Sequence, residues 1–571
     1  MKHRVRRLVV GTALGWLLIL TVVAVGVFGW KKDDSPSNVV LDPLTFDQPA
    51  LSESSPDSTS SGNNSKTNKN QSTDNSTGGN NGGSGNDSGN ENGGGSGGGG
   101  SNDKVFSSFN FATCLPPTAR AKADAIWNYY QQEQFGTPGT SYLNNTIRLY
   151  NKTYNSALLY QFEPLVDNTL SMIGACRDYG KLDYLARVLM ESEKGLTSID
   201  GFRVWKNVAN GTPYNAPYNE QIIDTTQFTY VHAKVISLIA DTPPAQRTAV
   251  MTNYVQRFLP IIVQDQLLRW EYGPKVFDYP FTVCPHPDNY FNYSQCLINK
   301  TQGTSPSYRR AILDRLVWMV ASNALLLQAQ ADDAAFVSLS APDRQKLLDF
   351  TSLASRLLET RITVTSLRNL TGATVAGMFF DAGIWTDHPD FAYAGYTSET
   401  KPNDNQKSPV AGVSGDSSHN RRYLFMLQAL YSARSLVGSQ FPSDNQMRGF
   451  TNQFAYSTFN GNFDRPLFTN YANANGWYRV NYGGNPAYGD PPFALGSPSA
   501  FTGGVLSLSA LNPDLLIIAD ALYKLALSTD PATVEHRYKY FERNSVGVYD
   551  PTLYSEQKSW RLMNMIYSVA R

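Results

Sequence analysis

The stretch between residues 379 and 436 gathers more side chains capable of acid–base and anion-binding chemistry than any other part of the chain. Two of the six histidines lie in it, together with carboxylates, tyrosines and two adjacent arginines. Proton transfer and charge neutralisation in a reaction need these residue types. The candidate site predicted from this stretch comprises Trp385, Asp387, His388, Tyr393, Tyr396, Asp416, His419, Arg421 and Arg422.

Asp416 opens a short polar segment, Asp-Ser-Ser-His, that leads directly into an apolar helical run. Short oxygen-bearing side chains in this place cap the free N–H groups of a helix, so we expect His419 in the first helical turn. The positive end of a helix dipole disfavours protonated imidazole and attracts anions. A neutral His419 beside Arg421 and Arg422 therefore suits proton transfer next to a bound anion. The alternative is that Asp416 is only a cap, His419 a structural residue and the arginines a solvated face.

Elimination from a uronic acid is the first chemistry that these residues predict. A cation must neutralise the sugar carboxylate, a base must remove the adjacent C5 proton, and an acid must protonate the leaving oxygen. The expected groups are His419 or His388 as the base, Arg421 or Arg422 on the carboxylate, and Tyr393 or Tyr396 as the acid. Epimerisation at C5 would use the same groups, with reprotonation from the opposite face.

Hydrolysis of a glycosidic bond is the second option. It needs two carboxyl groups about 5 to 5.5 Å apart for retention, or about 6.5 to 9.5 Å apart for inversion. Asp387 and Asp416 are the expected pair, with Asp381 and Asp390 as further candidates. A divalent metal held by a histidine pair and an aspartate has suitable ligand types but no diagnostic spacing, so no cofactor is expected.

Two shorter motifs combine an aromatic ring with a cation and are candidate sugar subsites. The first is Phe-Arg-Val-Trp-Lys around Trp205, and the second is Asn-Gly-Trp-Tyr-Arg, which contains Trp477 and Arg479. An aromatic platform stacks on a sugar ring while the cation pairs with an acid group. Each motif could equally be an aromatic anchor of the fold with an arginine stem lying over it.

The N-terminal part of the chain predicts a membrane anchor followed by a tether. A basic tail (1–7) precedes about 23 uncharged residues (8–30), enough to span a bilayer core of about 30 Å. The positive-inside bias places the tail in the cytoplasm and the rest of the chain on the far side. A cleaved signal peptide is the alternative. Residues 31–103, rich in Ser, Gly and Asn, are expected to be a disordered linker, which leaves 104–571 as the folded body.

Cysteine and charge content agree with an exported body. An even count of four cysteines predicts two disulfides, with Cys284 and Cys296 as the natural short loop, although buried free thiols are the alternative. The 48 basic and 48 acidic residues cancel. With no long basic run after the anchor, nothing indicates a nucleic-acid partner.

Apolar periodicity predicts a mainly helical body, an α/α toroid built from about eleven helices in hairpin pairs joined by long aromatic loops. The expected helical runs are 121–135, 164–179, 182–193, 220–240, 245–270, 308–331, 342–363, 418–437, 445–456, 513–527 and 555–570. These hairpins and the Asp-x-Ser-His-x-x-Arg segment from Asp416 to Arg422 resemble the α/α-toroid carbohydrate-active enzymes, which comprise polysaccharide lyases, glucuronyl-epimerase-like proteins and hairpin-toroid glycosidases. The resemblance implies a polysaccharide as the substrate. A non-catalytic glycan-binding or structural envelope protein on the same ring is the rival expectation.

Overall fold

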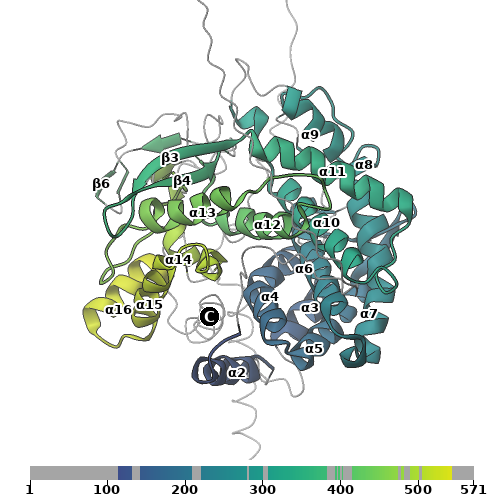
Figure 1. The fold of residues 1–571 in the computed structure, drawn as a ribbon, viewed down its shortest axis with the longest axis horizontal. Helices are drawn as coiled ribbons and strands as arrows, with labels where there is room; N and C mark the ends of the chain where they lie inside the picture. Colours follow the sequence, from purple (N-terminus) through teal and green to yellow (C-terminus); the bar gives the residue numbers. More distant parts are fainter. Residues whose placement is uncertain are drawn as a thin grey trace, which may run out of the picture. The chain divides into compact units, whose positions relative to one another are not determined.

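Helices make up most of the residues that the computed structural model of the protein describes (Figure 1), and the expectation of a mainly α fold is confirmed. The described residues, all in one compact unit, are 114–131, 142–208, 220–279, 282–299, 307–381, 392–394, 396–398, 401–402, 414–473, 478–480, 489–490, 492–500 and 504–542. The predicted anchor (8–30), the linker (31–103) and the helix expected at 555–570 lie outside them. No helix within these ranges is long and apolar enough to cross a membrane.

Successive helices follow the apolar periodicity of the sequence closely, and several of them begin at side-chain caps. Thr248 caps α7, Ser340 caps α11, and Ser443 forms a capping box with Gln446 at the start of α13. The main helices are α2 (Pro117–Gln131), α3 (Tyr142–Thr153), α4 (Ala157–Cys176), α5 (Tyr179–Met190), α6 (Ile222–Asp241), α7 (Ala249–Pro260), α8 (Arg269–Tyr272), α9 (Tyr290–Asn299), α10 (Asp314–Asp332), α11 (Ala341–Glu359), α12 (Asn420–Ala433), α13 (Asp444–Gln453), α14 (Gly496–Ala500), α15 (Asp514–Leu527) and α16 (Pro531–Arg537).

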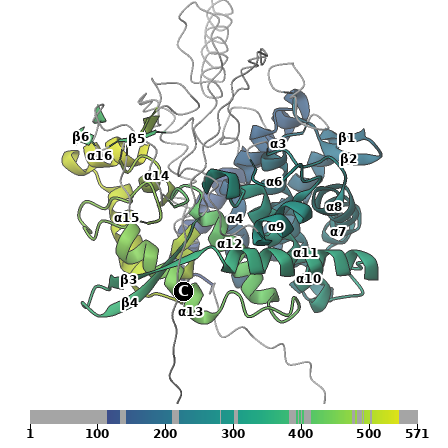
Figure 2. The same ribbon diagram turned by 90° about the horizontal axis from the view of Figure 1, so that it is seen from above.

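Four of these helices pack together, α4 on α6, α6 on α10 and α10 on α12, and α12 also contacts α4 through the Arg421–Glu163 pair (Figure 2). Helices α4 and α6 are parallel, because Ser156 before α4 bonds to Asp224 in the first turn of α6, and Asp167 bonds to Tyr230 further along both helices. Arg422 in the first turn of α12 contacts the starts of both α4 and α10. The N-termini of the four helices therefore lie at the same end of this group.

The helix that sequence periodicity divides wrongly is the one around Gly180. The break lies instead at Arg177, which has a left-handed backbone (φ 54°) and ends α4, and at Asp178, whose side chain accepts a hydrogen bond from Lys181 N (3.3 Å) and caps α5. Gly180 lies inside α5. The run expected at 245–270 is divided at Pro260, where α7 ends and continues as a π-helix, Ile261–Leu268.

Pro164 lies inside α4 rather than at the start of a helix as expected. A proline has no backbone N–H, so the carbonyl four residues earlier loses its helical donor. That carbonyl belongs to Tyr160, and it accepts a 2.7 Å hydrogen bond from Gln227 Nε2 of the neighbouring α6. The proline thus opens one backbone position of α4 to a side chain of α6.

The longest strands form a hairpin where the sequence analysis expected the end of a helix. Helix α11 ends at Glu359, and β3 (Ile362–Arg368) pairs antiparallel with β4 (Thr374–Phe380), Ile362 opposite Phe380. The β-branched run from Ile362 to Thr365 favours a strand over a helix. Shorter strands are β1 (Leu196–Ile199) with β2 (Phe202–Trp205), β5 (Ala392–Ala394) with β8 (Tyr478–Val480) and β9 (Gly489–Asp490), and β6 (Tyr396–Ser398) with β7 (Lys401–Pro402).

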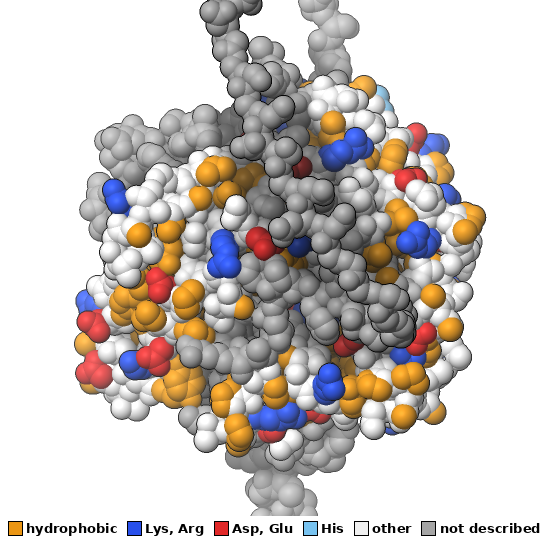
Figure 3. All heavy atoms as spheres, in the orientation of Figure 1, with side chains coloured by type: hydrophobic (Ala, Val, Ile, Leu, Met, Phe, Trp, Pro, Cys, Tyr) orange, Lys and Arg blue, Asp and Glu red, His pale blue; other side chains and the backbone are white. Residues whose placement is uncertain are grey.

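Charged side chains of both signs are scattered over the described part of the face that Figure 3 shows, with hydrophobic side chains between them. Basic and acidic side chains are therefore mixed on this face, as they are balanced in the whole sequence, and the fields of neighbouring charges largely cancel.

All four cysteines are paired, which confirms the two expected disulfides and the short Cys284–Cys296 loop. The other bond joins Cys114, just before α2, to Cys176, the last residue of α4, across 62 residues.

Removing the long-range disulfide should destabilise the body. A Cys114→Ser, Cys176→Ser double variant frees a long loop in the unfolded chain, and we expect a loss of about 2 to 4 kcal/mol in the free energy of unfolding. Urea unfolding followed by circular dichroism measures this loss. The matched Cys284→Ser, Cys296→Ser variant removes a bond that closes a shorter loop, so it should lose less stability. An equal or greater loss in that variant would contradict the prediction.

A second stability effect concerns Glu271 of α8, which is fully buried and accepts a 2.8 Å hydrogen bond from Asn323 Nδ2. Burial raises the pKa of the Glu271 carboxyl well above its ordinary value of 4.5, and the Asn323 bond acts in the opposite direction. Above that ordinary value the unfolded chain releases the proton while the folded protein keeps it. The stabilising contribution is therefore complete below the ordinary value and is lost as the pH rises toward the raised pKa.

Glu271→Gln should remove this pH dependence. Between the ordinary and the raised pKa of Glu271, we expect the free energy of unfolding of the variant to rise relative to that of the unsubstituted protein by up to about 1.4 kcal/mol per pH unit. Unfolding free energies at about pH 5 and about pH 8 provide the comparison. Parallel pH profiles for the two proteins would show that Glu271 is already ionised in the folded state.

Candidate active site

The segment 414–420 is held by backbone hydrogen bonds to residues 470–472. Asp416 pairs with Tyr471 in an isolated β-bridge, and Ser417 N donates to Asn470 O (2.8 Å). Helix α12 then begins at Asn420, with His419 as its N-cap, so the helix starts within two residues of the expected position. His419 therefore lies where a loop that is hydrogen-bonded to residues 470–472 meets a buried helix.

Asp416 and His419 form a buried pair. His419 Nδ1 lies 2.6 Å from Asp416 Oδ2, and Asp416 Oδ1 accepts hydrogen bonds from Ser418 Oγ and from His419 N (3.1 Å). With Nδ1 donating to the carboxylate, the lone pair of a neutral His419 is on Nε2. His419 Nε2 lies 3.9 Å from Asp314 Oδ2, at the first residue of α10. The pair is therefore arranged as an oriented proton acceptor.

The two arginines do not form the solvated face that was the alternative reading, since both are held by protein carboxylates. Arg421 makes a two-pronged contact with Glu163, Nη1 to Oε1 at 2.8 Å and Nη2 to Oε2 at 2.7 Å. Arg422 is buried, and it donates to Asp314 Oδ2 and to Tyr160 Oη. Burial alone lowers the pKa of Arg422, but Asp314 and the neighbouring carboxylates raise it above its ordinary value. The Arg422 guanidinium is therefore charged.

Helix α4 supplies a polar stripe that sequence analysis missed. Tyr160, Glu163 and Asp167 lie on one face of α4, and each contacts α6 or α12. Burial raises the pKa of Glu163, while the charge of Arg421 acts against this shift. Burial also raises the pKa of Tyr160, so its phenol remains protonated and can donate. In the sequence, this stripe could have been recognised from polar residues spaced three and four positions apart in an otherwise apolar helix.

The polar stripe continues deeper between α4 and α6. Tyr230 Oη donates to Asp167 Oδ1 (2.9 Å), and Lys234 Nζ donates to the same oxygen and to Ser171 Oγ, both at 2.7 Å. Trp318 of α10 donates to Gln227 Oε1 at 3.2 Å. Buried polar groups that satisfy one another in this way hold the helices at a defined offset.

Asp314 is the most accessible carboxylate of the group formed by Glu163, Asp314 and Asp416. Its side chain is 18% exposed, whereas those of Glu163 and Asp416 have no exposed surface. It occupies the first position of α10, where the helix dipole favours a negative charge. A ligand that reaches this network would therefore meet Asp314 before the other two carboxylates.

Trp205 is placed as a fold anchor rather than as an open platform. Its side chain is fully buried, its Nε1 donates to Ser192 O (3.1 Å), and its ring stacks on His232 at 5.2 Å between centroids. Burial lowers the pKa of His232 to about 3, so this histidine stays neutral inside its aromatic cluster. The indole ring has no face open to a sugar in this structure, because it is enclosed by the core.

The remaining predicted residues are only partly placed. Tyr393 of β5 is paired in register with Arg479 of β8, which brings two separately predicted residues to neighbouring strands. Tyr396 opens β6. The side-chain positions of these three residues are not described, and the residues that lie wholly outside the described ranges are Trp385, Asp387, His388, Asp390 and Trp477.

The carboxylate pair predicted for hydrolysis is represented by Asp416 alone, since Asp387 lies outside the described residues. Asp416 is enclosed and binds His419 and Ser418, so it orients a base rather than facing a substrate. Asp381 is ion-paired with Arg361 at 3.5 Å. Among the residues that the structure describes, no three His, Cys, Asp or Glu side chains are grouped so that they could hold a metal ion.

These observations define a mainly helical, disulfide-bonded protein whose helix N-termini enclose an Asp–His pair and two carboxylate-bound arginines. In comparisons with family models, curated proteins and solved structures, none of the three gives a match to the chain.

Proposed function

We propose that this protein is a membrane-anchored extracytoplasmic enzyme that acts on a polysaccharide, as a lyase or C5-epimerase on uronic-acid-containing glycans. The observation that carries the proposal is the buried Asp416–His419 pair, with Nε2 directed toward Asp314 at the shared N-terminal end of four helices. The parallel arrangement of α4, α6, α10 and α12 supports an α/α toroid, with these helices forming its inner wall. The two disulfides support an oxidising compartment for the body.

In this mechanism His419 removes the C5 proton through Nε2, and Asp416 stabilises the imidazolium that forms. Tyr160, whose hydroxyl contacts the Arg422 guanidinium, is the described tyrosine best placed to protonate the leaving oxygen. The Arg422 contact stabilises the phenolate left behind. Arg422 would neutralise the sugar carboxylate by exchanging Asp314 for the substrate as its partner.

Glycoside hydrolysis is the second candidate function, and Asp314 favours it. This carboxylate is partly exposed, is held by Arg422, and lies 3.9 Å from His419 Nε2. A hydrolase would use Asp314 with a second carboxylate, for which the sequence predicts Asp387.

The test is incubation of the full chain in detergent with a panel of acidic and neutral polysaccharides. Ultraviolet absorbance of an unsaturated product, reducing ends and proton exchange at C5 are followed together. Absorbance with reducing ends supports a lyase, C5 exchange alone an epimerase, and reducing ends alone the hydrolase. Binding of a glycan without any of these signals would instead support the non-catalytic glycan-binding protein and overturn the enzyme proposal.

A further inference from the structure

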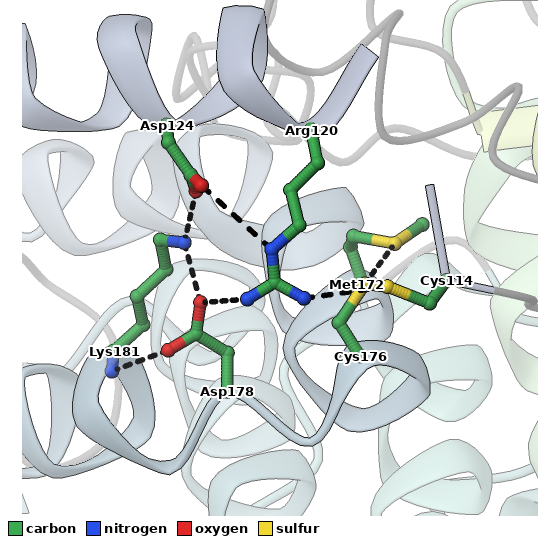
Figure 4. Close-up of a disulfide and its surroundings, with 7 residues drawn as sticks. All are labelled: Cys114, Arg120, Asp124, Met172, Cys176, Asp178 and Lys181. Atoms are coloured by element: carbon green, nitrogen blue, oxygen red, sulfur yellow. Dashed lines mark hydrogen bonds and ion pairs between the residues drawn. A yellow bond between two sulfur atoms is a disulfide. The ribbon is translucent and has the colours of Figure 1, made fainter. Parts of the chain in front are cut away.

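We propose that the Cys114–Cys176 disulfide is a thiol-exchange site that takes a small-molecule thiol. Figure 4 shows this bond between Cys114, a few residues before α2, and Cys176 at the end of α4, beside a group of four charged side chains. Cys176 lines a small surface cleft together with Met172, Arg120 and Lys181. Both cysteines are half-buried, and Cys176 is the one of the two that lines this cleft.

Arg120 is placed to stabilise the sulfur that leaves. Its Nη1 donates to Cys114 Sγ at 3.4 Å, while Nη2 donates to Asp178 Oδ2 at 3.1 Å. Lys181 bridges Asp178 and Asp124, and Asp124 lies 3.7 Å from Arg120 Nε. The carboxylates hold the guanidinium in position through its other nitrogens, and the sulfur receives an N–H of its own. A cationic donor beside a cysteine favours its thiolate form.

The two sulfurs of the bond differ, because Cys176 lines the cleft and Cys114 Sγ accepts the hydrogen bond from Arg120. This difference sets the direction of the exchange step. The incoming thiolate attacks Cys176 Sγ, which faces the cleft, and a new sulfur–sulfur bond forms there. The old bond breaks, and its electron pair goes to Cys114 Sγ, which leaves as a thiolate bonded to Arg120. A better-stabilised leaving thiolate departs faster. The small thiol is the only co-reactant, and the products are a mixed disulfide on Cys176 and a free Cys114.

The second disulfide has no cationic donor at its sulfurs among the described residues, and it serves as an internal control. Cys284 is buried, and its sulfur lies 3.9 Å from the Tyr293 carbonyl oxygen. Across the described ranges, no Lys or Arg side chain hydrogen-bonds to Cys284 or Cys296. The structure therefore assigns different reactivity to two bonds of the same chain.

The experiment treats the full chain in detergent with increasing concentrations of free cysteine, quenches by alkylation and maps the modified peptides by mass spectrometry. We expect cysteinyl adducts on Cys176 and alkylation of Cys114 at thiol concentrations about tenfold below those that open Cys284–Cys296. Opening of the two bonds at the same thiol concentration, or adducts mainly on Cys114, would overturn the proposal.

A variant pair tests the role of Arg120. Arg120→Gln should slow the exchange by about tenfold, because the leaving thiolate loses its cationic donor. Lys181→Gln disturbs the same ion-pair group without contacting a sulfur, so its exchange rate should stay close to that of the unsubstituted protein. Circular dichroism confirms that both variants are folded. Equal rates for the two variants would remove Arg120 from the mechanism and with it the basis of the proposal.

Discussion

Replacing His419 by alanine should lower kcat on the responsive polysaccharide by about 10²- to 10⁴-fold, the contribution expected from a positioned general base. The side chain is the only imidazole of the Asp416 pair, and its Nε2 is the atom directed toward Asp314. The assay is the combined absorbance and reducing-end measurement, with KM and kcat determined separately. A purely structural His419 would instead lower the amount of folded enzyme while leaving kcat per folded molecule unchanged.

Two further substitutions make this result interpretable. Asp416→Asn keeps the shape of the pair but removes the charge that stabilises the imidazolium, so it should also reduce kcat and shift the pH profile of kcat. His286→Ala removes an exposed histidine far from the pair in sequence, and it should leave activity unchanged. Equal activity losses in the His286 and His419 variants would point to a general effect of losing a histidine and would contradict a specific base.

The second large effect is expected at the Arg421–Glu163 pair. Arg421→Met leaves the fully buried Glu163 carboxylate without its cation, and we expect a loss of about 3 to 5 kcal/mol in the free energy of unfolding. Burial raises the pKa of Glu163, so the cost should shrink when the pH falls below that raised value and the carboxyl becomes neutral. Urea unfolding at several pH values measures both the loss and its pH dependence.

A double variant separates the lost contact from the stranded charge. Arg421→Met combined with Glu163→Leu removes both charges, and it should recover most of the stability, because the main cost is the uncompensated buried carboxylate. The control is Arg187→Met, which breaks a pair with Asp183 on the surface of α5 and should cost less than about 1 kcal/mol. A double variant no more stable than Arg421→Met would show that the pair itself, and not the stranded charge, holds α4 against α12.

Local patterns account for the parts of the fold that sequence analysis predicted well. Apolar periodicity located α6 and α15 to within two residues, because a helix facing the core must repeat its apolar residues every three to four positions. The hairpin β3–β4 was missed, because β-branched residues at the end of an apolar run are compatible with either state until packing against α13 selects one.

Sequence alone determined the helical character of the body, its two disulfides and the place where α12 begins beside Asp416 and His419. Only the tertiary structure decided what the arginines do, since the partners of Arg421 and Arg422 are 258 and 262 residues away in α4. The same holds for Gln227, which bonds to the carbonyl that Pro164 frees. Caps and periodicity act within one or two helical turns, whereas a buried charge must take its partner from whatever helix the packing brings alongside.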